Sequence, residues 1–149
     1  MTAINVSRLA FLAQLGTTLP LVGLIWLIQI VSYPLFLRVG PPDFSVYHSA
    51  HARLITFVVG PLMVVELAAA LAWAASTPPN VPQWLTATGL ALAIATWAFT
   101  FALAVPRHDA LANGFDAGVI ASLIRVNWFR TIAWTARGAI LMGALKRDG

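Results

Sequence analysis

Long apolar stretches, interrupted by few polar residues, dominate the pattern of this chain. They cover about residues 12–38, 44–76, 83–106 and 117–145, and short segments rich in proline, glycine or charge separate them. Each stretch is at least as long as the roughly 20 residues that an α-helix needs to cross a bilayer. Because lipid offers the backbone no hydrogen-bond partner, segments that cross it are helical. The pattern therefore predicts four transmembrane helices.

The breaks between the stretches predict how the helices are connected. Asp43, behind two prolines, and Asp116, behind an Asn-Gly pair, are expected to cap the second and fourth helices. Gly60-Pro61 predicts a kink within the second helix. Four helices with short connections favour an all-α, up-down-up-down bundle, with residues 1–149 as a single transmembrane domain.

Composition agrees with a membrane protein and excludes several classes of function. Hydrophobic residues make up 60% of the chain and charged residues only 9%, against about 25% charged in a soluble domain. The chain has no cysteine, which excludes disulfides, thiolate catalysis and cysteine-ligated metal clusters. The net charge of +4 comes from Lys and Arg spread along the chain. Without a basic run, we expect no nucleic-acid binding.

The three histidines of the chain form the first candidate site. His48 and His51 are three residues apart on one helix face, and His108 follows the third apolar stretch. The predicted topology places all three on one side of the membrane. Such a set could hold zinc, copper or iron, or ligate a haem axially. Alternatively, interfacial histidines could cap loops or bind lipid head groups, because a His-x-x-His pair alone is a weak motif.

Charged residues inside the predicted spans form the second candidate site. Glu66 lies near the middle of the second span, where a carboxylate costs several kcal/mol unless it is paired or protonated. On the last helix Asn127, Arg130, Trp134 and Arg137 follow one another at helical spacing. They form one continuous stripe, which we expect to face the bundle rather than the lipid.

Glu66 can pair with either Arg130 or Arg137, depending on where along the helices the membrane begins. One interpretation is a structural ion pair that fixes the order of the helices. The other is functional, because intramembrane charges commonly mark functional sites. Two arginines facing one glutamate leave one cation unmatched, which would suit an anionic or carbonyl-bearing substrate, a quinone or a lipid phosphate.

The histidines and the intramembrane charges are expected to form two separate clusters. His51 and Glu66 are 15 residues apart on one helix, roughly 22 Å. An apolar, aromatic-lined cavity between the clusters would suit a lipophilic small molecule. Gln29 and Tyr33 could join the pair of Glu66 with an arginine. The expected substrate-binding residues are Gln29, Tyr33, Trp97, Trp134 and Arg137.

Four segments of the chain carry a resemblance to known membrane proteins. They are residues 26–36 (WLIQIVSYPLF), the Phe44…Tyr47-His48…His51 set, residues 105–108 (VPRH) and residues 127–131 (NWFRT). In these segments the chain resembles an uncharacterised group of bacterial four-helix integral membrane proteins. The resemblance implies residence in the bacterial inner membrane.

A second resemblance rests on the four spans and on Asn127 and Arg130 of the last helix. In these features the chain is distantly similar to the anthrone-oxygenase-like membrane proteins, which are linked to oxidation of aromatic polyketides. The resemblance implies oxygenase chemistry and assigns no catalytic residue here.

Three functions remain open on the sequence. The preferred hypothesis is a membrane-embedded oxidoreductase or oxygenase acting on a lipophilic small molecule, with a metal or haem at the histidines. Its catalytic groups, which orient substrate or relay protons, would be Glu66, Arg130 and Asn127. The second is a non-catalytic subunit that docks on a membrane protein partner or forms a homo-oligomer. The third is a small proton-coupled carrier in which Glu66 titrates.

Overall fold

The computed structural model describes residues 3–148, and every element in this range is helical, without a β-strand. The elements form four long rods, two of which are continuous through short stretches of altered helical winding. The elements are α1 (Ala3–Leu27), η1 (Ile28–Ser32), α2 (Tyr33–Leu35), η2 (Phe36–Arg38), α3 (Pro41–Ala75), α4 (Gln83–Phe99), η3 (Thr100–Ala104), α5 (Val105–Ala112) and α6 (Ala117–Asp148). η1 and η3 are π-helical, and η2 is a 3₁₀ turn.

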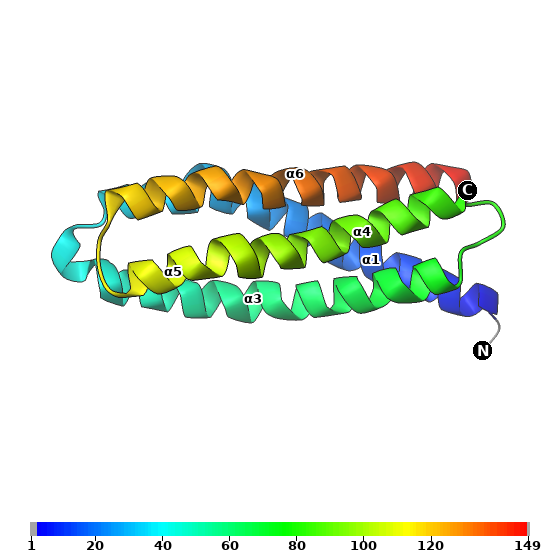
Figure 1. The fold of residues 1–149 in the computed structure, drawn as a ribbon. Helices are drawn as coiled ribbons and strands as arrows, with labels where there is room; N and C mark the ends of the chain where they lie inside the picture. Colours follow the sequence, from blue (N-terminus) through cyan, green and yellow to red (C-terminus); the bar gives the residue numbers. More distant parts are fainter. Residues whose placement is uncertain (1–2, 149) are drawn as a thin grey trace.

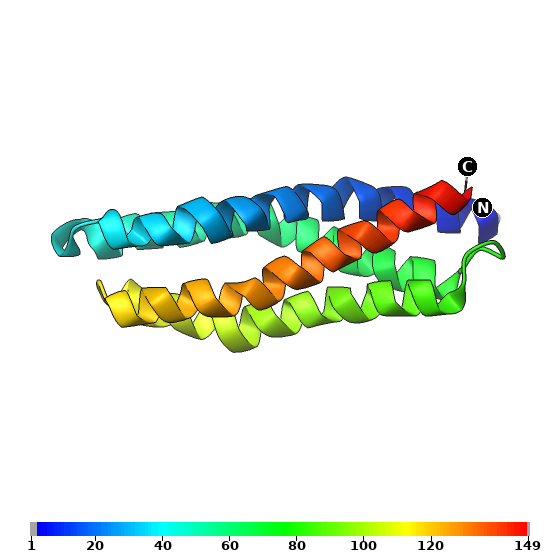
Figure 2. The same ribbon diagram turned by 90° about the horizontal axis from the view of Figure 1, so that it is seen from above.

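The four rods lie side by side in an elongated molecule (Figures 1 and 2). Both ends of the described chain lie at one end of the molecule, together with the connection at residues 76–82 (Figure 1). The connections at residues 39–40 and 113–116 lie at the opposite end. Residues 48 and 108, which are far apart in the sequence, therefore come from neighbouring parts of two different rods.

The two predicted helix caps have different outcomes. The cap at Asp116 is confirmed, because the backbone N–H of Val119 donates to Asp116 Oδ1 at 3.0 Å. The cap at Asp43 is wrong. α3 begins at Pro41, behind an extended Gly40, and Asp43 lies inside its first turn. Proline suits this position because its missing N–H would have no helical partner there.

Three of the four rods are long and apolar enough to cross a membrane. They cover Val6–Arg38, Pro41–Ala75 and Gln83–Ala112, with mean hydropathies of 1.9, 2.2 and 1.8. The fourth predicted span, residues 117–145, forms a long helix that does not meet this criterion. Arginines at three positions reduce its hydropathy: Arg125, Arg130 and Arg137.

Large apolar side chains are exposed on the surface of the bundle, and many polar side chains are buried inside it, as in membrane proteins. Among the described residues, Phe57, at 81%, is the most exposed of these apolar side chains. Two groups of buried apolar residues occupy the interior, one in each half of the molecule. The buried polar side chains that join the rods lie between and beside these groups, and they define the candidate site.

Candidate functional site

The centre of the bundle contains a buried ion pair between α3 and α6. Arg137 Nε donates to Glu66 Oε1 at 2.9 Å, and neither side chain has exposed surface. It is the only salt bridge among the residues that the structure describes. Of the two partners that the sequence allows, Glu66 therefore pairs with Arg137 and not with Arg130.

The carboxylate of Glu66 accepts two further hydrogen bonds. Thr18 Oγ1, on α1, donates to Glu66 Oε1 at 2.7 Å, and Trp134 Nε1, on α6, donates to Glu66 Oε2 at 3.0 Å. Both carboxylate oxygens thus have donors. One cation and two neutral donors therefore surround the buried carboxylate.

Every nitrogen of the Arg137 guanidinium also has a hydrogen-bond acceptor. Its Nη2 donates to Gln14 Oε1, on α1, at 2.7 Å, and its Nη1 donates to the backbone carbonyl of Gly89, on α4. A β-carbon at position 89 would lie 3.5 Å from Arg137 Nη1, an ordinary van der Waals distance, so the contact depends on the backbone carbonyl and not on the absence of a side chain. The cluster consequently binds all four rods to one another.

Arg130 lies seven residues before Arg137 on α6 and has a different environment. Its side chain is only 6% exposed, yet no carboxylate among the described residues lies within 4 Å of it. Nη1 donates to Asn127 Oδ1 at 3.2 Å, and the guanidinium lies 5.2 Å from the ring centre of Trp134. Nε is buried and has no hydrogen-bond partner in the part of the chain that the structure describes. Arg130 is therefore the unmatched cation that the sequence predicts.

A short amide network holds Asn127 beside Arg130. Asn127 Nδ2 donates to Gln29 Oε1 at 2.9 Å, and Gln29 Nε2 donates to the backbone carbonyl of Ile124 at 3.1 Å. Thr131 Oγ1 makes a longer contact, 3.4 Å, with the same Gln29 oxygen. The side-chain oxygen of Asn127 is thereby left facing Arg130.

Both π-helical segments contact α6, the helix that carries Asn127 and Arg130. Gln29 belongs to η1, and the other segment, η3, belongs to the third rod. A π-helical turn contains one more residue than an α-helical turn and is frequently found at functional sites. The altered winding therefore occurs in two of the three rods around α6.

Tyr33, His108 and His48 form a chain of hydrogen bonds across three elements. Tyr33 Oη and His108 Nε2 are 2.9 Å apart, and His108 Nδ1 and His48 Nε2 are also 2.9 Å apart. Tyr33 and His48 are buried, and His48 Nδ1 has no partner. The positive charge of Arg130 also acts on the Tyr33 hydroxyl, which lies near it.

The third histidine, His51, is not part of this series of hydrogen bonds. The ring of His51 meets those of Phe36 and Tyr33, with centroids 5.0 and 6.4 Å apart, and His51 Nε2 is buried without a partner. Over residues 3–148 there is no group of three or more His, Cys, Asp or Glu that could hold a metal ion. A metal or haem at His48, His51 and His108 stays a prediction.

Gln29 and Tyr33, which the sequence suggests as additions to the pair of Glu66 with an arginine, have other partners. Gln29 and Tyr33 bind Asn127 and His108, and neither joins the Glu66–Arg137 pair. Trp97 is half-buried against Phe101, with ring centroids 5.6 Å apart, and its Nε1 has no partner.

Two pockets in the described part of the chain lie away from the buried polar clusters. One is lined by residues of the 76–81 connection and the chain ends, and the other by the start of α3 near Ser45 and Arg53. Neither corresponds to the cavity expected between the clusters.

Sequence reasoning missed the partners of the ion pair on the first rod. Gln14 and Thr18 are polar residues at i, i+4 spacing in an otherwise apolar stretch. This spacing puts both on one face of the helix and was the available signal. Gly89 had no such signal, because it binds Arg137 through its backbone.

Comparisons with protein-family models, with curated proteins and with solved structures gave no match. The function of the chain must therefore be inferred from the geometry of its buried polar residues.

Proposed function

We propose that all four rods cross a bilayer, with α6 as the fourth span of an up-down-up-down bundle. The polar residues of α6 support this, because Asn127, Arg130 and Arg137 are buried inside the bundle. Apart from Arg125 and Thr135, the exposed residues of α6 between positions 117 and 145 are apolar, and Phe129 and Ile132 are 52% and 62% exposed. A helix of low mean hydropathy can cross lipid when its polar stripe faces other helices.

We further propose that the chain belongs to a membrane oxidoreductase system and binds a lipophilic carbonyl compound, such as a quinone, at Arg130. The observation that carries this proposal is the buried guanidinium without an anion. A buried cation is costly unless it is paired and hydrogen-bonded. A ligand oxygen with negative or partial negative charge would supply the acceptor that Arg130 Nε lacks.

The chain of Tyr33, His108 and His48 would carry protons to or from this ligand. The positive charge of Arg130 favours a Tyr33 oxygen whose lone pairs face it, so the Tyr33 O–H would donate to His108 Nε2. His108 Nδ1–H then donates to His48 Nε2, which leaves His48 Nδ1–H as the free end. Reducing a quinone to a quinol takes two electrons and two protons. Tyr33, His108 and His48 would transfer the protons, and a cofactor or membrane partner would supply the electrons.

The test is a titration of the protein in lipid nanodiscs with a short-chain benzoquinone, followed by quenching of tryptophan fluorescence. The Arg130→Gln variant should bind at least about tenfold more weakly, because a hydrogen bond to a charged group contributes about 1.5–3 kcal/mol. Arg125→Gln is the matched control, since Arg125 lies on the same helix but is exposed. Equal affinity in the wild type and Arg130→Gln would contradict the proposal.

A non-catalytic subunit is the second candidate, and the Glu66–Arg137 cluster favours it. That cluster links the four rods and offers neither charged group a free site for a ligand. The cluster would fix the order of the helices, and the exposed apolar faces would bind a partner protein. Absence of quinone binding in folded protein, together with a requirement for a partner in assembly, would favour this candidate. The same saturation of Glu66 gives no support to the carrier hypothesis.

A further inference from the structure

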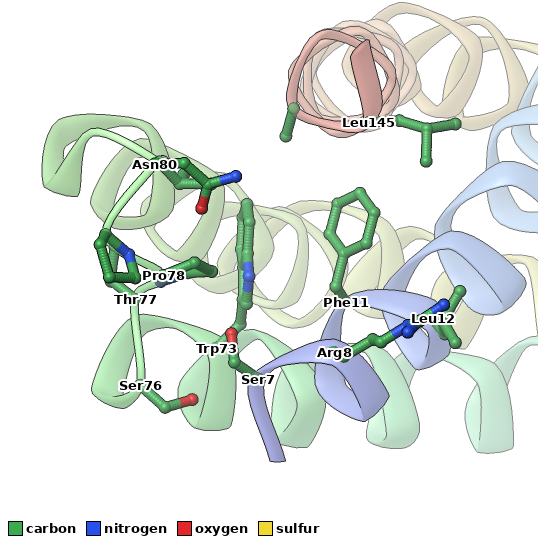
Figure 3. A pocket seen from close by; sticks show the side chains of 13 residues that line it. Ser7, Arg8, Phe11, Leu12, Trp73, Ser76, Thr77, Pro78, Asn80 and Leu145 are labelled. Carbon is green, nitrogen blue, oxygen red and sulfur yellow. The ribbon is translucent and has the colours of Figure 1, made fainter. Parts of the chain in front are cut away.

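A second site lies at the end of the molecule that contains the chain termini. A pocket of about 760 Å³ opens between the start of α1, the end of α3, the 76–81 connection and the end of α6 (Figure 3). Its volume is within the roughly 300–1,000 Å³ of small-molecule sites. It shares no lining residue with the Arg130 site.

Two buried polar atoms of side chains that form the wall of this pocket have no partner among the described residues. They are Ser7 Oγ and Trp73 Nε1, and their side chains are only 4% and 2% exposed. Buried polar groups are nearly always hydrogen-bonded, so each unpartnered atom requires an explanation. An indole N–H can only donate and a hydroxyl can donate, so a bound acceptor would satisfy both.

The charge of the lining residues selects the type of acceptor. Arg8 lines the pocket, and none of the lining residues that the structure describes is acidic. The hydroxyls of Ser76 and Thr77 already donate to backbone carbonyls of their own helix. The pocket therefore presents a cation at its surface, and two unused donors, Ser7 Oγ and Trp73 Nε1, lie buried in the side chains that form its wall. This combination suits a phosphate once the two side chains turn toward it.

The rest of the wall suits a hydrocarbon chain. Phe11, Leu12 and Leu145 line the pocket, and the ring of Phe11 lies 5.3 Å from that of Trp73 (Figure 3). Trp84, which is 61% exposed, lies at the start of α4, directly after the connection that lines the pocket. Tryptophans are enriched where a membrane protein meets the lipid head groups.

We propose that this pocket binds the phosphate head group of an anionic membrane lipid. Ser7 and Trp73 would donate to the phosphate oxygens, Arg8 would balance the charge, and the first part of an acyl chain would lie along Phe11, Leu12 and Leu145. The proposal depends on insertion of the chain in a bilayer, but not on quinone binding at Arg130.

Native mass spectrometry of the full chain tests it. The detergent-purified protein is equilibrated with equal amounts of phosphatidylglycerol and phosphatidylcholine of the same acyl chains. We expect one phosphatidylglycerol retained per chain, with about tenfold preference over phosphatidylcholine. The Ser7→Ala/Trp73→Phe variant should lose about tenfold in retention, and Arg8→Gln should lose the preference between the two lipids.

Control variants separate this pocket from general lipid binding. Trp84→Phe changes an exposed tryptophan at the same end, and Ser49→Ala/Arg53→Gln changes the pocket at the opposite end. Both should retain phosphatidylglycerol as the wild type does. Thermal unfolding shows whether Ser7→Ala/Trp73→Phe is folded, and the exposed Arg8 provides a test that does not depend on it.

Three results would overturn the proposal. They are equal retention of the two lipids by the wild type, an unchanged preference in Arg8→Gln, and displacement of phosphatidylglycerol by millimolar inorganic phosphate. The last result would identify a site for a free anion rather than for a lipid.

Discussion

Arg137 and Arg130 lie on the same face of α6, about two turns apart, and both are buried, yet their surroundings differ. Every nitrogen of Arg137 donates to an acceptor, and one of these acceptors is the carboxylate of Glu66. Arg130 has one amide oxygen and two aromatic neighbours, and its Nε has no partner. The same residue type thus serves two different purposes.

The difference separates what stabilises this bundle from what it can bind. A buried ion pair that is fully hydrogen-bonded recovers much of its desolvation cost. Removing one partner strongly destabilises the fold, because the other charge is left buried and unpaired. A buried cation without an anion retains that cost in the free protein. This difference supports the proposal that Glu66 and Arg137 hold the architecture and that Arg130 binds the ligand.

The largest expected effect is that of Arg137→Leu on stability. Leaving Glu66 buried without its cation should reduce the free energy of unfolding by about 3–5 kcal/mol. Reversible unfolding in mixed micelles measures it, with Arg125→Leu as the exposed control. The double variant Glu66→Gln/Arg137→Leu should be less destabilised than the sum of the single variants. Strict additivity would mean that the two charges do not stabilise each other.

Thr18→Val should have the next largest effect. It removes the hydroxyl that donates to Glu66 Oε1 while keeping the volume of the side chain, and should cost about 1.5–3 kcal/mol. Thr17→Val is a close control, because Thr17 is also buried but donates only to carbonyls of its own helix. Equal losses in the two variants, measured by the same unfolding assay, would argue against a special role for Glu66.

Arg130→Gln should change the stability by less than about 1 kcal/mol in either direction. The lost contacts with Asn127 and Trp134 are offset by removal of an unpaired buried charge. The variant is measured beside Arg137→Leu under the same conditions. A loss as large as that of Arg137→Leu would show that Arg130 is a structural residue.

The smallest expected effect is local and concerns protonation. In the wild type, His108 should carry its proton on Nδ1, because we propose that the Tyr33 hydroxyl donates to Nε2, 2.9 Å away. In Tyr33→Phe that donor is lost, and ¹⁵N NMR of histidine-labelled protein should show a shift of the His108 Nε2 resonance. Tyr47→Phe, which changes the other tyrosine of the chain, should leave it unchanged. An unchanged spectrum in Tyr33→Phe would contradict the proposed direction of the hydrogen bonds.

The helices and the inward polar stripe could be predicted from the sequence, because apolar length and helical spacing are local properties. The partner of Glu66 could not. The choice between Arg130 and Arg137 depends on how far one helix is shifted along another. Two π-helical segments and the start of α3 at Pro41, rather than after Asp43, affect that shift. Nothing in the local pattern of residues 28–32 or 100–104 marked the extra residue per turn.

The role of Gly89 could not be predicted for a related reason. It acts through a backbone carbonyl, which every residue has, and only the packing of α4 against α6 selects this one. By contrast, the hydroxyl of Thr18 and the amide of Gln14 were visible as polar positions in an apolar helix. Their importance depended on a partner 48 or more residues away in the chain.

The most direct test of the account is a quinone titration of Arg130→Gln and Thr18→Val beside the wild type, in nanodiscs of one composition. Thr18→Val should bind quinone as the wild type does although it is less stable, and Arg130→Gln should bind at least about tenfold more weakly although it is folded. The contradicting result is the reverse pattern, with normal binding in Arg130→Gln or with affinity that follows stability in both variants.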